Sequence, residues 1–434
     1  MGADALFAVA LIAGLLVLLL LGLEIAWSVG VVAVVGLIWY VDQPINQIAY
    51  TLWGSLNSFT LTAMPLFILM GSILGNTGVN ERLFNAIDKW VGHLPGGLGV
   101  SVICGNAVFG AMSGSTIAAT ATFGKIAFPV MEQRKYNPSF SLGSIASGTV
   151  LAPLIPPSIL LILYGAWQGV SIVDLLAAGL IPGLTLTALF LVTITVMVKL
   201  NPALAPPPVK YSWADRRRAL WEALPFALMI IGVLGAIFGG LMTPTEAGGL
   251  GAFLSIVLTL GYRKLTYKLF SDSLLDTVKI TSFSLFIMAM STLISHVFNS
   301  AGMIPLIKEQ VLGLTIGKYG ILLGFFVMYF FMGMFFDSWS MLFLTFPFVM
   351  PIVGGLGFDP IWWGVVYVMA AEQSTITPPF GLSLFVLRSV VPDYPIGTIV
   401  KGALPYLVAI YINIILLILF PQLATWLPKL LSGN

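Results

Sequence analysis

The chain has 434 residues, of which 59% are hydrophobic and only 8% are charged. Soluble domains carry about 25% charged residues, so this composition excludes a soluble enzyme and points to a lipid bilayer. The net charge of +2 gives no reason to expect nucleic acid as a partner. With one cysteine and two histidines, the chain also lacks the ligands for a disulfide framework or a Cys/His metal centre.

Ten apolar segments of helix length predict ten membrane crossings, at 5–22, 24–41, 59–76, 139–168, 175–199, 223–242, 246–262, 281–299, 361–390 and 398–427. Two of them are too long for one straight crossing and contain the pairs Pro156-Pro157 and Pro378-Pro379. Proline interrupts a helix because it lacks a backbone donor and clashes with the preceding turn. We therefore predict two broken helices, at 139–168 and 361–390.

Two further apolar regions, 98–131 and 318–353, have polar centres at residues 112–116 and 336–340. Each predicts a re-entrant hairpin that returns to its own side of the membrane. With both hairpins re-entrant, fifteen Lys and Arg residues fall on one side and three on the other. The positive-inside rule makes the first side cytoplasmic and places both termini outside.

Segments 80–91 and 304–314, each just before a hairpin, have apolar residues at helical spacing. They predict amphipathic helices in the membrane interface, with a solvated connecting loop as the alternative.

The two halves of the chain form a repeat with an offset of 222 residues. This offset aligns Met112 with Met334 and the first Pro-Pro pair with the second. Each half has five crossings, an odd number, so the second half is inverted relative to the first. The predicted fold class is an all-α polytopic membrane protein with inverted repeats, typical of secondary transporters.

The broken helices have a chemistry of their own, because a proline leaves a carbonyl without its helical partner. Around Ala152 and Ile155 such carbonyls face the hydroxyl-rich tip at residues 113–116, and residues 374–381 face the second hairpin around Gly333. Sodium is a hard cation that binds backbone carbonyls and hydroxyls. We therefore expect two equivalent cation sites, one in each half.

Helix N-termini near the midplane attract anions, and a carboxylate or sulfonate between the two hairpin tips fits this arrangement. The alternative is that these small residues serve helix packing. The predicted substrate contacts are Ser113, Gly114, Ser115, Thr116, Ser158, Asp337, Ser338, Ser340 and Thr375.

Ionisable residues inside apolar segments are functional candidates. Asp337 and Glu372 either tune a cation site, carry a proton, or hydrogen-bond freed backbone N–H groups. Lys125 and Arg388 are candidate counter-charges for a substrate. The alternative is that their long side chains extend to the membrane–water interface. A membrane enzyme would need an acidic metal cluster or a nucleophile with its base. The sequence offers neither, so we expect no catalytic residue.

Several motifs resemble the large membrane subunit of tripartite ATP-independent periplasmic (TRAP) transporters over essentially the whole chain. They are Gly71-Ser72-Ile73-Leu74 with Thr77-Gly78, Met112-Ser113-Gly114-Ser115, Leu154-Ile155-Pro156-Pro157-Ser158-Ile159, and Ile376-Thr377-Pro378-Pro379-Phe380-Gly381-Leu382 with Leu384-Phe385-Val386.

The resemblance implies an elevator transporter of a bacterial or archaeal inner membrane, with a small four-helix membrane subunit and a periplasmic substrate-binding protein as partners. By the family's pattern, one sodium site involves Ser113, Ala152, Ile155 and Pro157, and the other Gly333, Ser374, Thr377 and Phe380. Positions 152 and 374 are commonly glycine in that family.

The predicted organisation divides the chain into four parts. Residues 1–97 hold scaffold helices and the first arm helix, and 98–200 the first half of a transport domain; 201–317 hold scaffold helices and the second arm helix, and 318–434 the second half. The predicted function is sodium-coupled uptake of a small organic anion. A sodium- or proton-coupled transporter that works without a binding protein is the alternative.

Overall fold

The structure is a computed structural model that describes residues 3–41, 44–379 and 381–433, and the elements it forms in these ranges are all helical. They are α1 (Ala3–Leu20), α2 (Ile25–Trp39), α3 (Asn46–Leu56), η1 (Phe59–Thr62), α4 (Ala63–Asn76), α5 (Val79–Val91), α6 (Leu98–Ser113), α7 (Thr116–Gln133), α8 (Pro138–Gly148), η2 (Thr149–Leu151), α9 (Ile159–Gln168), α10 (Ile172–Leu200), η3 (Pro202–Leu204), α11 (Trp213–Phe238), α12 (Pro244–Gly261), α13 (Tyr267–Ser300), α14 (Met303–Leu312), α15 (Gly317–Met332), α16 (Ser338–Gly355), α17 (Pro360–Thr375), α18 (Leu382–Val390), α19 (Ile396–Leu419) and α20 (Gln422–Ser432).

The predicted multi-pass membrane protein is confirmed by helices that are long and apolar enough to cross a bilayer, which takes about 20 residues. Within the described residues there are six: Phe59–Asn76, Ile172–Leu200, Trp213–Phe238, Tyr267–Ser300, Ser338–Gly355 and Ile396–Leu419. Other predicted crossings are shorter; α2, for example, has 15 residues. The two broken crossings consist of shorter helices, as the Pro-Pro pairs predict.

Both predicted hairpins form. In the first, α6 and α7 are joined at Gly114, whose φ of +56° suits glycine. The Ser115 side chain then caps α7 by accepting a hydrogen bond from the Ala118 backbone N–H at 3.4 Å. In the second hairpin, α15 and α16 both pack against α17.

Both predicted broken helices form as well. In the first, α8 continues through the short turn η2, and an irregular segment leads to α9. In the second, α17 and α18 flank an irregular segment. The peptide bonds Pro156-Pro157 and Pro378-Pro379 are both cis.

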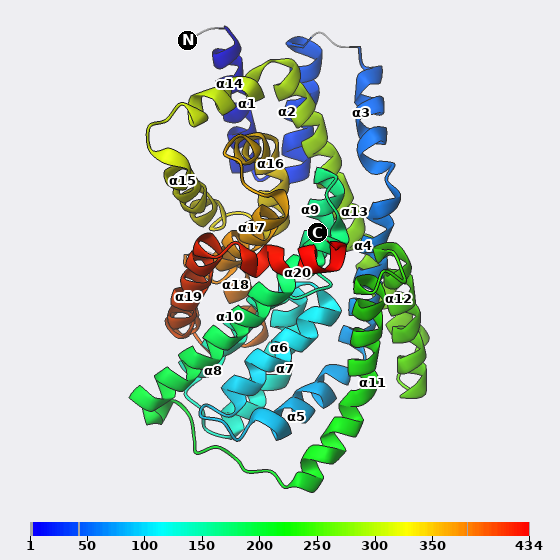
Figure 1. The fold of residues 1–434 in the computed structure, drawn as a ribbon, viewed down its shortest axis with the longest axis vertical. Coiled ribbons are helices and arrows are strands. Elements are labelled where there is room, and N and C mark those ends of the chain that lie inside the picture. Colours follow the sequence, from blue (N-terminus) through cyan, green and yellow to red (C-terminus); the bar gives the residue numbers. More distant parts are fainter. Residues whose placement is uncertain (1–2, 42–43, 380, 434) are drawn as a thin grey trace.

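The two predicted amphipathic segments are helices, and they lie at opposite ends of the molecule (Figure 1). At the N-terminal end α14 lies beside α1 and α2, whereas α5 lies at the other end, near the start of α11 (Figure 1). Each is preceded by a left-handed glycine, Gly78 with φ +70° and Gly302 with φ +69°. Equivalent helices at opposite ends are what an inverted repeat requires.

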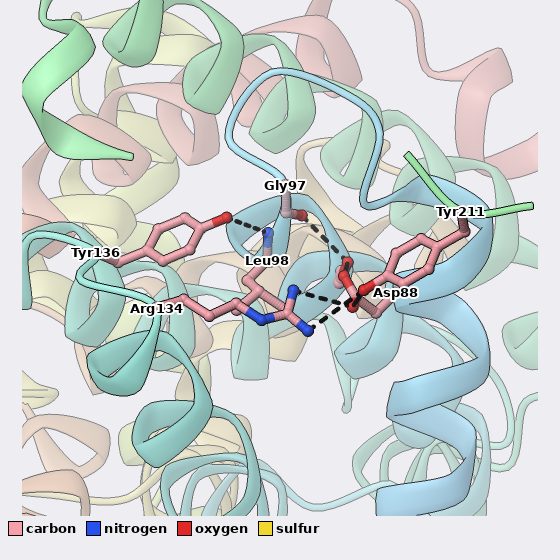
Figure 2. Close-up of polar contacts among 7 residues, drawn as sticks. Asp88, Gly97, Leu98, Arg134, Tyr136 and Tyr211 are labelled. Atoms are coloured by element: carbon pink, nitrogen blue, oxygen red, sulfur yellow. Dashed lines mark hydrogen bonds and ion pairs between the residues drawn. The ribbon is translucent and has the colours of Figure 1, made fainter. Parts of the chain in front are cut away.

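A polar cluster joins α5 to the first hairpin and to the linker before α11 (Figure 2). Asp88 of α5 is 5% exposed and accepts hydrogen bonds from the hydroxyls of Ser101 at 3.1 Å and Tyr211 at 2.5 Å. Arg134, at the end of α7, lies 3.4 Å from the same carboxylate. Burial and the hydrogen bond to Asp88 raise the pKa of Tyr211, so its hydroxyl stays protonated and donates.

The structure corrects several predicted boundaries. The helix α3 was not predicted, and α11 and α13 begin 10 and 14 residues before the predicted spans at 223 and 281. Their first turns carry charged side chains, which lower hydropathy without opposing helix formation. The predicted crossing 398–427 is wrong as one helix, because α19 ends at Leu419 and α20 begins after Pro421.

The two halves come very close to each other where α8 crosses α19. A Cβ atom built on Gly143 would lie 2.1 Å from the Gly402 carbonyl carbon, and one on Gly402 would lie 1.8 Å from the Ser139 carbonyl oxygen. The Ser144 and Tyr406 hydroxyls form a hydrogen bond of 2.7 Å beside this contact. Glycine lets the two helix backbones touch, as in other membrane helix pairs.

We expect Gly402→Ala to destabilise the fold, because the added methyl group has no space and overpacking costs about 1 to 3 kcal/mol. The measurement is thermal unfolding of the purified protein in detergent. Gly397→Ala on the same helix is the control, since a Cβ there meets nothing within 4 Å and alanine favours the helix. Equal melting temperatures for both variants would contradict the assigned contact.

Candidate transport site

The two hairpin tips meet at one carboxylate, that of Glu372 on α17. Thr116, the first residue of α7, donates its hydroxyl proton to Glu372 Oε2 at 2.7 Å. Ser338, the first residue of α16, donates to Oε1, also at 2.7 Å. Glu372 is only 2% exposed, so this carboxylate connects the tips inside the protein and is not presented to solvent.

Thr116 and Ser338 are equivalent positions of the repeat, since the offset of 222 residues carries one onto the other. Both stand at helix N-termini, where the helix dipole stabilises negative charge. The sequence predicts a substrate anion between the tips. The structure places the protein's own Glu372 there, with the Thr116 and Ser338 hydroxyls engaged to it. Their assignment as substrate contacts stays a prediction.

Asp337 and Ser340 are engaged within the second tip. The Asp337 side chain caps α16, accepting hydrogen bonds from the backbone N–H groups of Trp339 at 3.0 Å and Ser340 at 3.3 Å, and from the Ser340 hydroxyl. Tyr367 on α17 donates its hydroxyl to the Ser338 carbonyl at 2.5 Å. Of the roles that the sequence leaves open for Asp337, the structure shows binding of freed backbone N–H groups.

The first hairpin tip lies directly on the first break, as the sequence predicts. A Cβ built on Gly110 would lie 2.6 Å from the Ala152 Cα atom, and one on Gly114 would lie 3.0 Å from the Pro157 carbonyl oxygen. Ser158 caps α9 by accepting a hydrogen bond from the Leu161 backbone N–H at 3.2 Å, and it donates to the Pro153 carbonyl. The predicted substrate contact Ser158 is thus fully buried in the break.

The oxygen atoms of the first break fit a hard cation. Within the described residues no hydrogen bond reaches the carbonyls of Ala152 and Ile155, and the buried Ser113 hydroxyl has no partner either. Buried polar groups usually have partners, and unpaired oxygens in an apolar surrounding suit sodium. With Pro157, these are the residues that the resemblance implies for the first sodium site.

The second break has similar residues, but its hydroxyl groups form hydrogen bonds, whereas the Ser113 hydroxyl at the first break has no partner among the described residues. Gly333 touches Ser374, since a Cβ on Gly333 would lie 1.8 Å from the Ser374 Cβ. The Ser374 hydroxyl donates to the Ala371 carbonyl at 2.5 Å, and that of Thr377 to the Gln373 carbonyl at 2.7 Å. Each hydroxyl oxygen keeps lone pairs for a cation. The predicted ligand Phe380 lies outside the described residues.

Thr375 belongs to the same break, where its hydroxyl donates to the Glu372 carbonyl at 2.8 Å. A Cβ on Gly381 would lie 2.9 Å from the carbonyl oxygens of both Thr375 and Thr377. Backbone oxygens therefore gather at this break too, although the predicted substrate role of Thr375 stays untested.

A cavity of about 330 Å³ lies between the first hairpin, α4 and α13. Ser113 and Ser115 line it from the first tip, and Trp339 lines it from the second. Of the predicted substrate contacts these two serines line the cavity, whereas the other seven do not: Gly114, Thr116, Ser158, Asp337, Ser338, Ser340 and Thr375. Its size suits a small organic molecule.

The opposite wall of this cavity is polar. Asn76 donates to the Ser273 hydroxyl at 3.2 Å, and the Ser72 hydroxyl lies 3.4 Å from Asp276. Asn76 and Asp276 also line a second cavity, of about 510 Å³, at the start of α13. The two cavities therefore adjoin at these two residues, and the second reaches Thr266 in the loop before α13.

Paired re-entrant hairpins against broken helices, around a polar cavity within a multi-pass bundle, define a membrane transporter. Residues 12–423 match the family model described as "Tripartite ATP-independent periplasmic transporter, DctM component". The chain belongs to this family, the large permease subunits of TRAP transporters. The resemblance seen in the motifs is confirmed, and the chain is a transporter subunit and not an enzyme.

Two relatives illustrate the similarity. The chain is 32% identical to the sialic acid TRAP transporter large permease protein SiaM of Vibrio cholerae, over 97% of this chain and 98% of that protein. It is also 32% identical to the C4-dicarboxylate TRAP transporter large permease protein DctM of Pseudomonas aeruginosa, over 93% and 94%.

The fold is also similar to the YdaH transporter of Alcanivorax borkumensis, whose crystal structure was reported to have an unusual topology. The TM-score is 0.60 at 17% identity, with 88% of this chain and 89% of that chain covered. At this identity the similarity concerns the fold alone.

Sequence reasoning weighed Glu372 but missed its role between the tips. Of the roles considered, none had the carboxylate accepting side-chain hydroxyls from both hairpins. The available signal was the repeat itself, because the offset pairs Thr116 with Ser338. Asp276 gave no signal, since it lies in the polar first turns of α13 that hydropathy leaves out.

We expect Glu372→Ala to destabilise the protein and abolish transport, because the Thr116 and Ser338 hydroxyls lose their acceptor. Each unpaired buried donor costs about 1 to 3 kcal/mol. Thermal unfolding is the measurement, with the exposed Glu309→Ala as control. Thr116→Val and Ser338→Ala should each cost stability in the native background and little in the Glu372→Ala background. Full additivity would show that the residues do not act together.

Proposed function

We propose that the chain performs sodium-coupled uptake of a small organic anion across the inner membrane by an elevator mechanism. The observation that carries this proposal is the cavity between the first hairpin and the helices α4 and α13, next to oxygen atoms that have no partner. Relatives are named as permeases for sialic acid, C4-dicarboxylates and isethionate, all of them acids.

The elevator proposal rests on how the hairpins are joined. Because Glu372 binds both tips, the segments 98–200 and 318–434 can move as one transport domain. The segments 1–97 and 201–317 then form the scaffold, with α5 and α14 as arms. Substrate at the boundary is carried when the transport domain slides, and the cavity has scaffold helices on one wall and a hairpin on the other, as this motion needs.

The sodium proposal assigns Ser113, Ala152, Ile155 and Pro157 to one site and Gly333, Ser374, Thr377 and Phe380 to the other. Bound sodium would supply positive charge next to the substrate anion. Two sodium ions with a monoanion carry one net charge inward, which is worth about 2.3 kcal/mol per 100 mV.

The state described here is inward-facing under this proposal. The cavity adjoins the one at the start of α13, which is lined by Lys268 and Lys279. By the positive-inside rule this basic end is cytoplasmic, which leaves both termini outside.

Two partners belong to the proposal: a small four-helix membrane subunit and a periplasmic substrate-binding protein. The isethionate permease DctMQ of Oleidesulfovibrio alaskensis supports the first, since the match covers 62% of its length and leaves room for a fused subunit. The binding protein would deliver the anion, and the alternative is transport without it.

Uptake into proteoliposomes tests the coupling, with the small subunit in the membrane and the binding protein, loaded with its labelled ligand, outside. We expect uptake with an inward sodium gradient and none with a potassium gradient of equal strength. Equal uptake under both gradients would rule out sodium coupling.

Thr377→Val should weaken the sodium dependence of that uptake, because it removes a proposed ligand oxygen. Thr193→Val is the matched control: the Thr193 hydroxyl donates to the Leu189 carbonyl at 2.8 Å, the same type of bond that Thr377 makes to Gln373. The sodium concentration for half-maximal uptake should rise in the first variant only. An unchanged value would remove Thr377 from the site.

A further inference from the structure

The only ionisable residues that line the cavity of about 330 Å³, among those the structure describes, are Lys125 and Asp276. Lys125 belongs to α7, on the transport-domain wall, and Asp276 belongs to α13, on the scaffold wall. No ion pair joins them in the described part of the chain. The cavity therefore presents one positive and one negative group on facing walls.

The side of α7 that faces the cavity is defined by Ala118, Ala121, Thr122 and Lys125. These positions are three, four and seven residues apart, which is the spacing of one helix face. Lys125 thus lies on the face of α7 that lines the cavity, and the hairpin tip residues Ser113 and Ser115 line the same cavity.

The tip region itself is not free to attract an anion with its helix dipoles alone. The Glu372 carboxylate already accepts the hydroxyls at both helix N-termini. A substrate anion in the cavity needs a positive group that Glu372 does not engage, and Lys125 is the one cation lining the cavity in the described residues.

The scaffold wall of the cavity, at Asp276, favours a different kind of ligand group from the wall at Lys125. Among the described residues, the Asp276 carboxylate has the Ser72 hydroxyl, at 3.4 Å, as its one hydrogen-bond donor, and Asn76 lines the wall beside it. A ligand group facing Asp276 gains by donating hydrogen bonds, whereas a second acidic group there meets like charge. Hydroxyl groups match this wall.

We propose that Lys125 binds the carboxylate of the substrate and that Asp276 accepts hydrogen bonds from its hydroxyl groups, so that the cavity takes hydroxylated monocarboxylates. This inference rests on the proposed transport function and names the substrate class of the same site. A polyhydroxylated acid of about six carbon atoms fits a cavity of this size.

Ligand-induced thermal stabilisation of the chain, purified with its small membrane subunit, tests the site with three matched probes. D-gluconate carries one carboxylate, D-glucarate carries two, and sorbitol carries none. We expect gluconate to stabilise the protein, glucarate to do so more weakly, and sorbitol to have no effect. If gluconate stabilised the protein no more than sorbitol does, the proposal would be overturned.

Variants identify the residues. Lys125→Ala should weaken gluconate binding by about tenfold or more, as expected for loss of a charge-assisted bond, and Lys125→Arg should restore most of it. Lys199→Ala is the control. Lys199 is exposed at the end of α10, and its substitution removes the same charge away from the cavity. Asp276→Asn should reduce the difference between the thermal stabilisation by gluconate and that by glucarate, because the second carboxylate of glucarate no longer meets a like charge. Unchanged gluconate binding in Lys125→Ala would overturn the assignment.

Failure of this site and failure of the proposed function are distinguishable. One outcome is that sodium drives uptake of the binding protein's ligand while Lys125→Ala leaves gluconate binding unchanged. This outcome would overturn the site and leave sodium coupling intact. Gluconate binding that depends on Lys125, without any effect of a sodium gradient, would support the site and reject the coupling.

Discussion

A backbone carbonyl that loses its helical partner must find another one when hydrocarbon rather than water surrounds the helix. The structure meets this constraint in two ways. Some freed groups are bound by neighbouring side chains, as Ser158 binds the Pro153 carbonyl and Asp337 binds the N–H groups at the start of α16. Others, the carbonyls of Ala152 and Ile155, accept no hydrogen bond from any described residue. These unpaired oxygens are the ones that the proposed sodium site uses.

The same constraint explains why the hairpins and the broken helices occur together. A hairpin tip leaves the N–H groups of one helix start without helical partners, and a break does the same to carbonyls, so both need polar surroundings that hydrocarbon does not provide. Gly110 and Gly114 allow the first tip to lie against the backbone of the first break. Gly333 allows the same closeness to Ser374 in the second half. Glycine at these points therefore determines how closely each hairpin can approach the broken helix.

The sequence predicts most of the architecture because prolines, glycines and apolar runs act locally. The hairpins, the breaks and the inverted repeat follow from Pro156-Pro157, Pro378-Pro379 and the fixed offset between them. Hydropathy describes fit to lipid and not helix formation, so it misses α3 and the charged first turns of α11 and α13. The bond between Thr116 and Glu372 joins residues 256 positions apart. Nothing local in the sequence indicates that contact, and so the candidate site was only partly predictable.

The contact of Glu372 with both hairpins also departs from the symmetry of the repeat. The repeat offset pairs Glu372 with Val150, which is completely buried in the turn after α8, and that turn packs against α17. An exactly symmetric chain would carry the same residue at both positions. Two carboxylates buried side by side in an apolar setting would repel each other, whereas one carboxylate has two oxygens and can serve both hairpins. The difference between the halves at this position therefore lets a single carboxylate join them.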